Sequence, residues 1–110
     1  MMGAVADVDV FSALANPVRR RLLELLAEGP RNAGALAEAF DLSRPAVSEH
    51  LQVLRRASLV REEVRGRERH YELVPDALAD VRTWLRPFER YWRDRLSALS
   101  DHLAEEQPEP

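Results

Sequence analysis

Four polar side chains recur at helical spacing in the middle of the chain. Arg44, Ser48 and Gln52 are four residues apart, and Glu49 lies beside them. On an α-helix this spacing places side chains on one face. An ordinary solvated face more often carries long cation–carboxylate pairs, whereas these groups can hydrogen-bond to the edges of nucleic-acid bases. The segment is therefore a candidate base-reading helix, with a plain surface helix as the alternative.

The residues around this polar face predict the helix that positions it. The Ser43 hydroxyl can accept a hydrogen bond from an otherwise unpaired N–H of the first turn, and Pro45 falls inside that turn, where it costs no hydrogen bond. Val47, Leu51 and Leu54 recur at i, i+4 and i+7 and form an apolar face. An amphipathic helix is therefore predicted to begin directly after Ser43.

Other kinds of chemistry find little support. The chain has no cysteine, which excludes disulfides, thiolate metal sites and cysteine nucleophiles. Its three histidines are scattered, and we interpret His50 as a hydrogen-bonded structural residue. Ser48, Glu49 and His50 cannot form a triad, because successive helical residues diverge. We expect no enzyme, no catalytic residue, no metal site and no cofactor.

The charge distribution favours a polyanionic partner for the middle of the chain. The formal net charge is −3, but residues 17–70 carry eleven Arg against eight acidic residues. The acidic excess lies in the two flanking segments. The sequence shows neither a secretion signal nor a membrane-spanning stretch, so we expect a soluble cytoplasmic protein without a membrane partner.

Two helices are predicted ahead of this region. A short amphipathic helix is expected near residues 7–15, and Asn16 followed by Pro17 marks the start of a second. The three consecutive arginines at 19–21 point in three directions on that helix, so we interpret them as solvated surface. The apolar positions of the first helix are Val8, Phe11 and Leu14, with Val10 beside them.

A third helix completes a candidate helix-turn-helix motif. Asn32 can cap it, and its inner face is formed by Leu36, Ala37 and Phe40 together with Ala33. A tight turn joins it to the base-reading helix, which predicts a helix-turn-helix over residues 33–57. An ordinary pair of antiparallel helices remains the alternative at this point.

The segment after residue 57 changes to strand periodicity. Residues 59–73 read as two alternating segments around Gly66, which can supply the positive φ of a tight turn. This β-hairpin carries Arg65, Arg67 and Arg69 near its tip. A basic hairpin beside a helix-turn-helix is a wing, and we expect these arginines to contact phosphates or the minor groove. Backbone contacts are also expected from Ser43 and Arg55.

The last predicted element is a dimerisation helix over residues 76–104. Its apolar residues recur every 3.6 residues on average, and Pro87 is expected to kink or restart it. The stripe exceeds what one small core can cover, so we expect a homodimer, with folding back onto the chain's own core as the alternative. The expected interface residues are Phe11, Leu14, Trp84, Leu85, Phe88, Tyr91, Trp92, Leu96 and Leu99.

These elements predict a mainly α fold with a small β-hairpin, a winged helix-turn-helix in the order α-α-α-α-β-β-α. We expect residues 1–106 to form one domain and residues 107–110 a disordered tail. The function that this arrangement favours is sequence-specific binding of double-stranded DNA by a homodimer. The alternative is a winged-helix module for protein–protein contact, with a merely solvated wing.

The chain resembles ArsR-type (arsenical-resistance-repressor type) transcription regulators. The resemblance is carried by residues 13–21, 36–38, 43–54 and 59–60. It implies a winged-helix dimer that represses transcription from an inverted-repeat operator near its own promoter. It also implies release by an inducer, either a small molecule or a protein.

The resemblance does not extend to metal sensing. Many relatives bind metal through a Cys-x-Cys pair at the start of the third helix, where this chain has Asn32 and Gly34. Others use Asp/His sets on the last helix, and here only Asp101 and His102 stand near its end. The chain is therefore identified as a member of a branch that does not sense metals.

Overall fold

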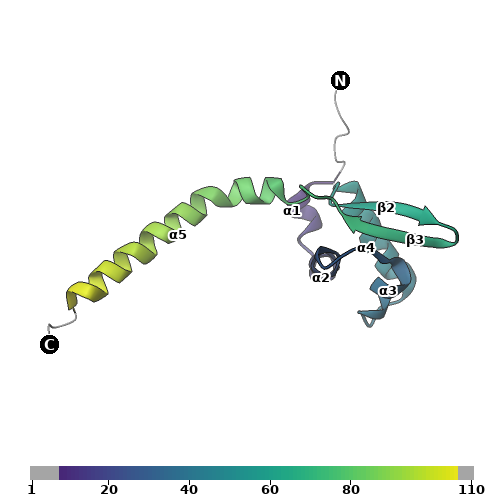
Figure 1. The fold of residues 1–110 in the computed structure, drawn as a ribbon, viewed down its shortest axis with the longest axis horizontal. Helices are drawn as coiled ribbons and strands as arrows, with labels where there is room; N and C mark the ends of the chain where they lie inside the picture. The colour runs from purple at the N-terminus through teal and green to yellow at the C-terminus, as the bar shows by residue number, and fades with distance from the viewer. Residues whose placement is uncertain (1–7, 107–110) are drawn as a thin grey trace, which may run out of the picture. The chain divides into compact units, whose positions relative to one another are not determined.

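The computed structural model describes residues 8–106, which divide into two compact units, one ending at Ala79 and one beginning at Asp80. Residues 1–7 and the tail expected at 107–110 lie outside the described residues. The first unit contains seven short elements, and the second is formed by the long helix α5 (Ala79–Glu106) (Figure 1). The elements of the first unit are α1 (Val10–Ala13), α2 (Pro17–Ala27), β1 (Arg31–Asn32), α3 (Ala33–Glu38), α4 (Arg44–Arg56), β2 (Val60–Arg65) and β3 (Glu68–Leu73).

Side-chain caps begin the helices where the sequence predicts them. The Asn16 carboxamide accepts from the amide of Val18 at 2.8 Å, and Pro17 occupies the first turn of α2. Asn32 caps α3 through the amide of Ala35 at 2.7 Å. The Ser43 hydroxyl caps α4 through the amide of Ala46 at 3.2 Å. Since the helix-turn-helix is bounded by these caps, its position follows from local hydrogen bonding.

The core of the first unit lies where α4 packs against α2, α3 and β2. The predicted apolar face of α4 is buried, and the side chain of Tyr71 on β3 closes the core from the hairpin side. Burying side chains of this size stabilises the fold by about 1.5–3 kcal/mol each. The largest fully buried residues are Tyr71, Leu22, Leu36, Leu51, Leu54, Leu59 and Val47.

The β-sheet has three strands, whereas the sequence indicates only the hairpin. The strand order is β1-β3-β2, all antiparallel, with Arg31 opposite Tyr71 and Asn32 opposite His70. A two-residue strand has no hydrophobic period of its own, because its identity depends on the partner strand. The hairpin itself has the predicted turn, with Gly66 at a φ of 63°.

Helix α1 is shorter than predicted and buries a different set of side chains from the one expected. The Asp9 carboxylate accepts from the amides of Phe11 and Ser12, so the helix begins after Asp9 rather than near residue 7. Val10 and Ala13 are buried, whereas Phe11 is 40% exposed. Of the apolar residues expected in α1, Val10 is therefore buried and Phe11 is exposed, and the helix begins later than predicted because Asp9 caps it.

The three consecutive arginines of α2 are not all solvated, which corrects the prediction for this run. Arg19 donates from Nε to the carbonyl of Ala13 at 2.7 Å, and Arg20 donates to the carbonyl of Leu14 at 2.8 Å. These carbonyls at the end of α1 have no acceptor role within the helix. Arg20 and Arg21 both remain exposed, and Arg21 forms an ion pair with Glu24.

Helix α5 begins three residues later and ends two residues later than the predicted range 76–104. It continues through Pro87 without the break that a restart would produce, and it curves along its length (Figure 1). Among residues 8–106, no helix combines the length and apolar character needed to cross a membrane.

Candidate nucleic-acid interface

Helix α4 presents Arg44, Ser48 and Glu49 on its outer side. Arg44 and Glu49 are exposed and Ser48 is half-buried. The Arg44 guanidinium makes no hydrogen bond or ion pair within the part of the chain that the structure describes. Other exposed arginines of this unit are paired with carboxylates; for example, Arg61 forms an ion pair with Glu72 at 3.3 Å. Arg44 is therefore a cation available to an external ligand.

Gln52, the fourth predicted base-reading residue, is placed differently. Its side chain is half-buried between α4 and the hairpin. Nε2 donates to Glu62 Oε2 at 3.1 Å and lies 3.4 Å from the hydroxyl oxygen of Tyr71. Oε1 accepts from Arg55 Nη1 at 3.3 Å. Gln52 thus belongs both to the outer surface of α4 and to a polar network with the hairpin.

Glu62 is the centre of that network. Its side chain is 7% exposed, and Oε1 lies 2.9 Å from Arg69 Nη1 and 3.6 Å from Arg55 Nη1. Tyr71 donates its hydroxyl proton to Oε2 at 2.7 Å. Because these partners satisfy both oxygens, an ionised carboxylate is held between α4 and the two strands.

Burial and hydrogen bonding act in opposite directions on this carboxylate. Burial acts to raise the pKa of Glu62, but the hydrogen bonds from Tyr71 and Gln52 and the charges of Arg69 and Arg55 outweigh it, so the pKa falls below its usual 4.5. Burial and the hydrogen bond to Glu62 raise the pKa of Tyr71 to about 12. At neutral pH the pair therefore consists of an acceptor-only carboxylate and a neutral phenol.

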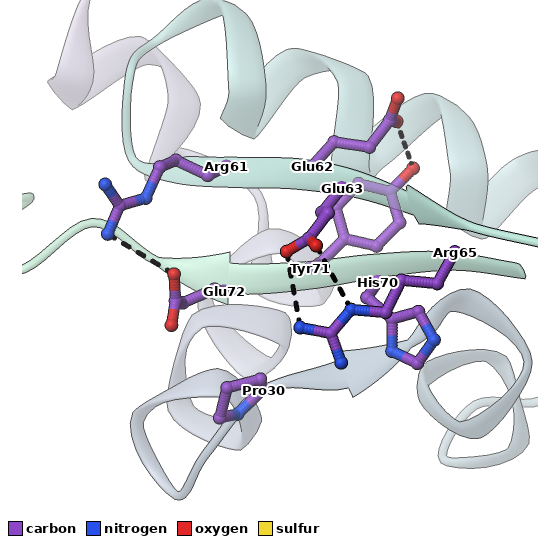
Figure 2. Close-up of a pocket in the computed structure, with 8 residues that line it drawn as sticks. All are labelled: Pro30, Arg61, Glu62, Glu63, Arg65, His70, Tyr71 and Glu72. Atoms are coloured by element: carbon purple, nitrogen blue, oxygen red, sulfur yellow. Dashed lines mark hydrogen bonds and ion pairs between the residues drawn. The ribbon is translucent and has the colours of Figure 1, made fainter.

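The hairpin has two chemically distinct faces. Figure 2 shows Arg61, Glu63 and Arg65 on the face opposite the Tyr71 ring, where Arg65 donates to Glu63 at 3.2 and 3.3 Å. Arg69 lies on the face of Glu62, because Val64 pairs with Arg69 across the strands. Arg67 lies in the turn and makes no hydrogen bond or ion pair with any residue from 8 to 106. The three predicted wing arginines therefore point in different directions.

A polar groove of about 520 Å³ separates the start of α4 from the tip of the hairpin. Arg44 and Arg67, which make no hydrogen bond or ion pair within the described residues, both line it, and Arg69 also contributes. One wall is closed by Asn32, whose Nδ2 donates to Glu68 at 2.9 Å. Two free guanidinium groups in one groove are suited to a phosphate group, which arginine can bind with two parallel hydrogen bonds.

His50 and Asn32 have structural partners. Arg19 Nη1 donates to His50 Nδ1 at 3.3 Å, which confirms the interpretation of His50 as a hydrogen-bonded residue. Asn32 Oδ1 is engaged in capping α3. Within the described residues, no three His, Asp or Glu side chains are placed to share a metal ion.

Helix α5 carries the expected interface residues as an exposed apolar stripe. Trp84, Tyr91 and Trp92 are 52–57% exposed and Leu96 is 66% exposed. The rings of Trp84 and Phe88 lie 4.8 Å apart, and the rings of Phe88 and Trp92 lie 6.3 Å apart. Leu85 on this helix and Leu14 near α1 are half-buried. Such aromatic ladders on a surface are typical of a protein–protein interface.

The sequence does not predict the hydrogen-bonded pair of Glu62 and Tyr71 that contacts Gln52. Strand alternation places them on one side of the hairpin, which was a usable signal. Their joint contact with Gln52 depends on how the hairpin packs against α4, and no sequence pattern reports that distance.

Comparison with known proteins places this geometry among transcription regulators. The model of a helix-turn-helix domain family matches residues 14–63. The chain is 42% identical over 96 residues to the HTH-type transcriptional regulator Rv2034 of Mycobacterium tuberculosis, with 87% of each chain covered. It is 36% identical over 80 residues to the transcriptional repressor SdpR of Bacillus subtilis, covering 73% of this chain and 89% of that one.

Solved structures agree with these relatives. The ArsR family transcriptional regulator RHA00566 matches with a TM-score of 0.69 and 31% identity, over 76% of this chain and 92% of that chain. A possible transcriptional regulator for arsenical resistance matches with a TM-score of 0.68 and 39% identity, over 93% of this chain and 99% of that chain.

Proposed function

Because this chain belongs to the ArsR family of winged helix-turn-helix transcription regulators, which bind DNA and are not enzymes, we propose that it is a homodimeric repressor of an inverted-repeat operator. The observation that carries the proposal is the pair of uncommitted arginines, Arg44 and Arg67, on one groove between α4 and the wing. With α4 in the major groove of a duplex, Arg44 would contact base edges and Arg67 would contact the phosphate backbone.

Helix α4 enters the major groove in this proposal. Arg44 bonds to a guanine, Ser48 to a neighbouring base and Glu49 to a cytosine amino group, since these are the pairings that the groups favour. Gln52 reads a base from the position that the Glu62 network allows. Ser43 and Arg55, at the two ends of the helix, contact the backbone.

The wing supplies contacts that do not depend on sequence. Arg67 and Arg69 border the groove and bind phosphates or enter the minor groove. Arg65 lies on the other face and reaches a phosphate only by leaving Glu63. Arg69 likewise exchanges part of its contact with Glu62 for a phosphate.

Two copies of the chain pair through α5 in this proposal. The aromatic stripe of α5 leaves a large apolar surface in contact with water, which is unfavourable. A symmetric dimer in which the same face of both copies meets would bury this surface. Phe11 and Leu14 extend the interface, and residues 1–106 act as one functional domain. Two-fold symmetry then places the two α4 helices about 34–36 Å apart, one turn of DNA.

Regulation follows from the family in the same way. A relative is named a transcriptional repressor, which supports repression by this chain. We place this repression in the cytoplasm and propose that a small-molecule or protein inducer releases it. Asn32 and Gly34 stand at the start of α3, and both polar groups of Asn32 are already engaged. We therefore propose that this chain does not sense metal.

A metal titration tests that part of the proposal. Zinc or nickel added at one equivalent to the purified protein on its operator is expected to leave binding unchanged, because a metal site needs several converging His, Asp, Glu or Cys donors. Fluorescence anisotropy of the labelled operator measures the complex. Release of DNA by one equivalent of either ion would contradict the expectation and direct attention to Asp101 and His102.

Selection from a pool of random duplexes tests the function itself. A repressor of this kind enriches an inverted repeat, and its affinity for random duplex falls with salt by about 0.9 log units per phosphate contact for each tenfold rise in salt. A protein–protein module would enrich no motif and show no such slope. Footprinting upstream of the chain's own gene then shows whether the selected repeat lies in its own promoter.

A further inference from the structure

Arg19 on α2 joins the end of α1 to helix α4. Its Nε donates to the carbonyl of Ala13 at 2.7 Å, and its Nη2 donates to the carbonyl of Ser12 at 3.2 Å. Its Nη1 lies 3.3 Å from Nδ1 of His50, which belongs to α4. All three nitrogen atoms of the guanidinium group therefore have partners on other elements, and we call these three contacts the Arg19 clasp.

The clasp requires one form of the His50 imidazole. A guanidinium group only donates hydrogen bonds, so Nδ1 must accept and the neutral ring must carry its proton on Nε2. Within residues 8–106, Arg19 is the only hydrogen-bond or ion-pair partner of this side chain. The Arg19 backbone is held too, because its amide donates to the Asn16 carboxamide at 3.2 Å. The contact thus joins a fixed donor to a defined acceptor.

Helix α1 depends on arginine side chains for its attachment to α2. The helix is a single turn whose buried side chains are Val10 and Ala13. The last carbonyls of a helix lack acceptor roles within it and need outside donors. Arg19 supplies donors to one part of this end, and Arg20 donates to the carbonyl of Leu14 at 2.8 Å. These two arginines therefore hold the end of α1, and Arg19 also reaches α4.

His50 anchors α4 on the side away from the hairpin. Gln52 lies two residues further along the helix and donates to Glu62 of the hairpin at 3.1 Å. Residues two apart on an α-helix are separated by about 200°, so His50 and Gln52 project in nearly opposite directions. Helix α4 is thus held by polar contacts on two sides, and the Arg19 clasp is the contact that connects it to α1.

We infer that Arg19 is a positioning residue for DNA recognition: acting through His50, it fixes α4 relative to α1 and thereby sets the separation of the two α4 helices in the dimer. The inference rests on the proposed function, in which Phe11 and Leu14 extend the dimer interface. Phe11 is 40% exposed on the helix whose end Arg19 holds. Because α1 lies at the interface in that dimer, a contact from α1 to α4 fixes how far α4 stands from the two-fold axis. The spacing of the half-sites on DNA follows from that distance.

The spacing preference of single variants tests the inference. Arg19→Met removes the clasp, and His50→Leu removes only its acceptor on α4. Both variants are expected to bind the selected operator about tenfold more weakly, because a hydrogen bond from a charged group is lost. They should also lose the preference of the wild type for that operator over versions with one base pair more or fewer between the half-sites. Fluorescence anisotropy with the labelled duplexes measures both properties.

His50→Asn is the variant that restores the contact. The Asn Oδ1 is bonded to Cγ as the His Nδ1 is, so it can accept from Arg19. This variant is expected to keep the affinity and the spacing preference of the wild type. If it behaves like His50→Leu, acceptance of the Arg19 hydrogen bond is not the role of His50, and the inference is overturned.

Arg20→Met is the matched control. Arg20 also holds the end of α1, but the structure gives it no hydrogen bond or ion pair to α4. Its loss is expected to leave the spacing preference unchanged, and circular dichroism shows whether each variant is folded. The same loss of spacing preference in Arg20→Met as in Arg19→Met, or an unchanged preference in His50→Leu, overturns the inference.

A measurement on the wild-type protein needs no folded Arg19 variant. Nitrogen-15 NMR of the histidine side chains shows which ring nitrogen carries the proton, and the signals of His50 are identified by their absence in His50→Asn. The neutral ring is expected to have its proton on Nε2 and a free lone pair on Nδ1. A proton on Nδ1 is incompatible with the clasp and overturns the inference.

The outcomes also separate this inference from the proposed function. If the wild type selects an inverted repeat but tolerates changes in half-site spacing, the inference fails and the repressor proposal stands. If the wild type selects no operator, the proposed function fails and the inference fails with it.

Discussion

At the scale of single residues, the arginines of the first unit differ in whether they are already paired. Arg21 and Arg61 are bound to carboxylates at 3.2 and 3.3 Å, whereas Arg44 and Arg67 bind no described residue. An exposed ion pair contributes about 0–1 kcal/mol, so its main effect is to occupy the guanidinium. An unpaired arginine on the outer side of α4 is free to contact an external anion or base edge.

Replacing Arg44 by Ala is expected to relax base preference at one position in each half-site. The loss of a two-bond guanine contact costs about 1–3 kcal/mol of discrimination. Competition binding with single-base variants of the selected operator measures it, and Arg21→Ala is the control for removing a surface charge. An equal loss of affinity for operator and random duplex would instead make Arg44 a phosphate contact.

The Glu62 carboxylate provides a prediction at the same scale. Its pKa is lowered in the folded protein, so its ionised form stabilises the fold at pH values above the ordinary 4.5. As pH falls through the lowered pKa, the carboxylate is protonated and this contribution is lost. A protonated glutamate and a glutamine then have similar hydrogen-bonding groups.

Glu62→Gln is therefore expected to lower the free energy of unfolding by about 1–3 kcal/mol at pH 7, and this cost should shrink progressively as pH falls below 4.5. Urea denaturation of both proteins at a series of pH values from 7 downward gives the comparison. A cost that does not change with pH over the whole acidic range would show that the charge of Glu62 is not what stabilises the contact.

At the scale of elements, the hairpin is held to α4 by polar contacts as well as by the core. Tyr71 is buried and its hydroxyl contacts Glu62 and Gln52, so the hairpin and α4 share one network. Strand alternation then sends Arg65 and Arg69 to opposite faces. The wing should thus bind DNA through its tip and one face.

The salt dependence of DNA binding distinguishes the wing arginines. Arg67→Ala is expected to reduce the slope of log affinity against log salt by about 0.9, since it removes one phosphate contact. Arg65→Ala is expected to change it less, because Arg65 is paired with Glu63 on the other face. Titrations of random duplex at four or five salt concentrations provide the slopes. A larger effect of Arg65 than of Arg67 would place the DNA on the other face of the hairpin.

At the scale of the whole molecule, helix α5 carries a long apolar stripe on its own surface. Large side chains along α5, from Trp84 to Leu103, are 40–66% exposed. Burial of an aromatic or leucine side chain is worth about 1.5–3 kcal/mol. In the proposed dimer, several such residues in each copy would be enough to hold the two copies together, and two copies would double the contacts with DNA.

Trp92→Ala combined with Leu96→Ala is expected to yield a monomer, or an unfolded chain if the dimer is obligate. Operator binding should collapse in either case, because a monomer makes only half of the contacts. Analytical ultracentrifugation measures the oligomeric state of the variant, and circular dichroism shows whether it is folded. Fluorescence anisotropy of the labelled operator measures DNA binding. Asp94→Ala, on the other side of α5, is the control, and a folded monomer that still binds the full operator tightly would refute the mechanism.

The sequence by itself determined the elements whose signals are local. Asn16, Asn32 and Ser43 cap helices through amides two or three residues away, and Gly66 forms the turn, so each acts within its own segment. The family and the position of the helix-turn-helix followed from these signals and from the residues between them. The short range of these interactions is the reason that the sequence reveals them.

Only the tertiary structure decided which polar groups are free and which are engaged. Gln52 shares its helical face with Arg44, yet Gln52 is tied to the hairpin and Arg44 is not. Strand β1 exists because β3 lies beside it, and Arg19 is engaged because its helix packs near the end of α1. These contacts join residues far apart in the chain or on separate elements, and helical or strand periodicity specifies a face without specifying what that face meets.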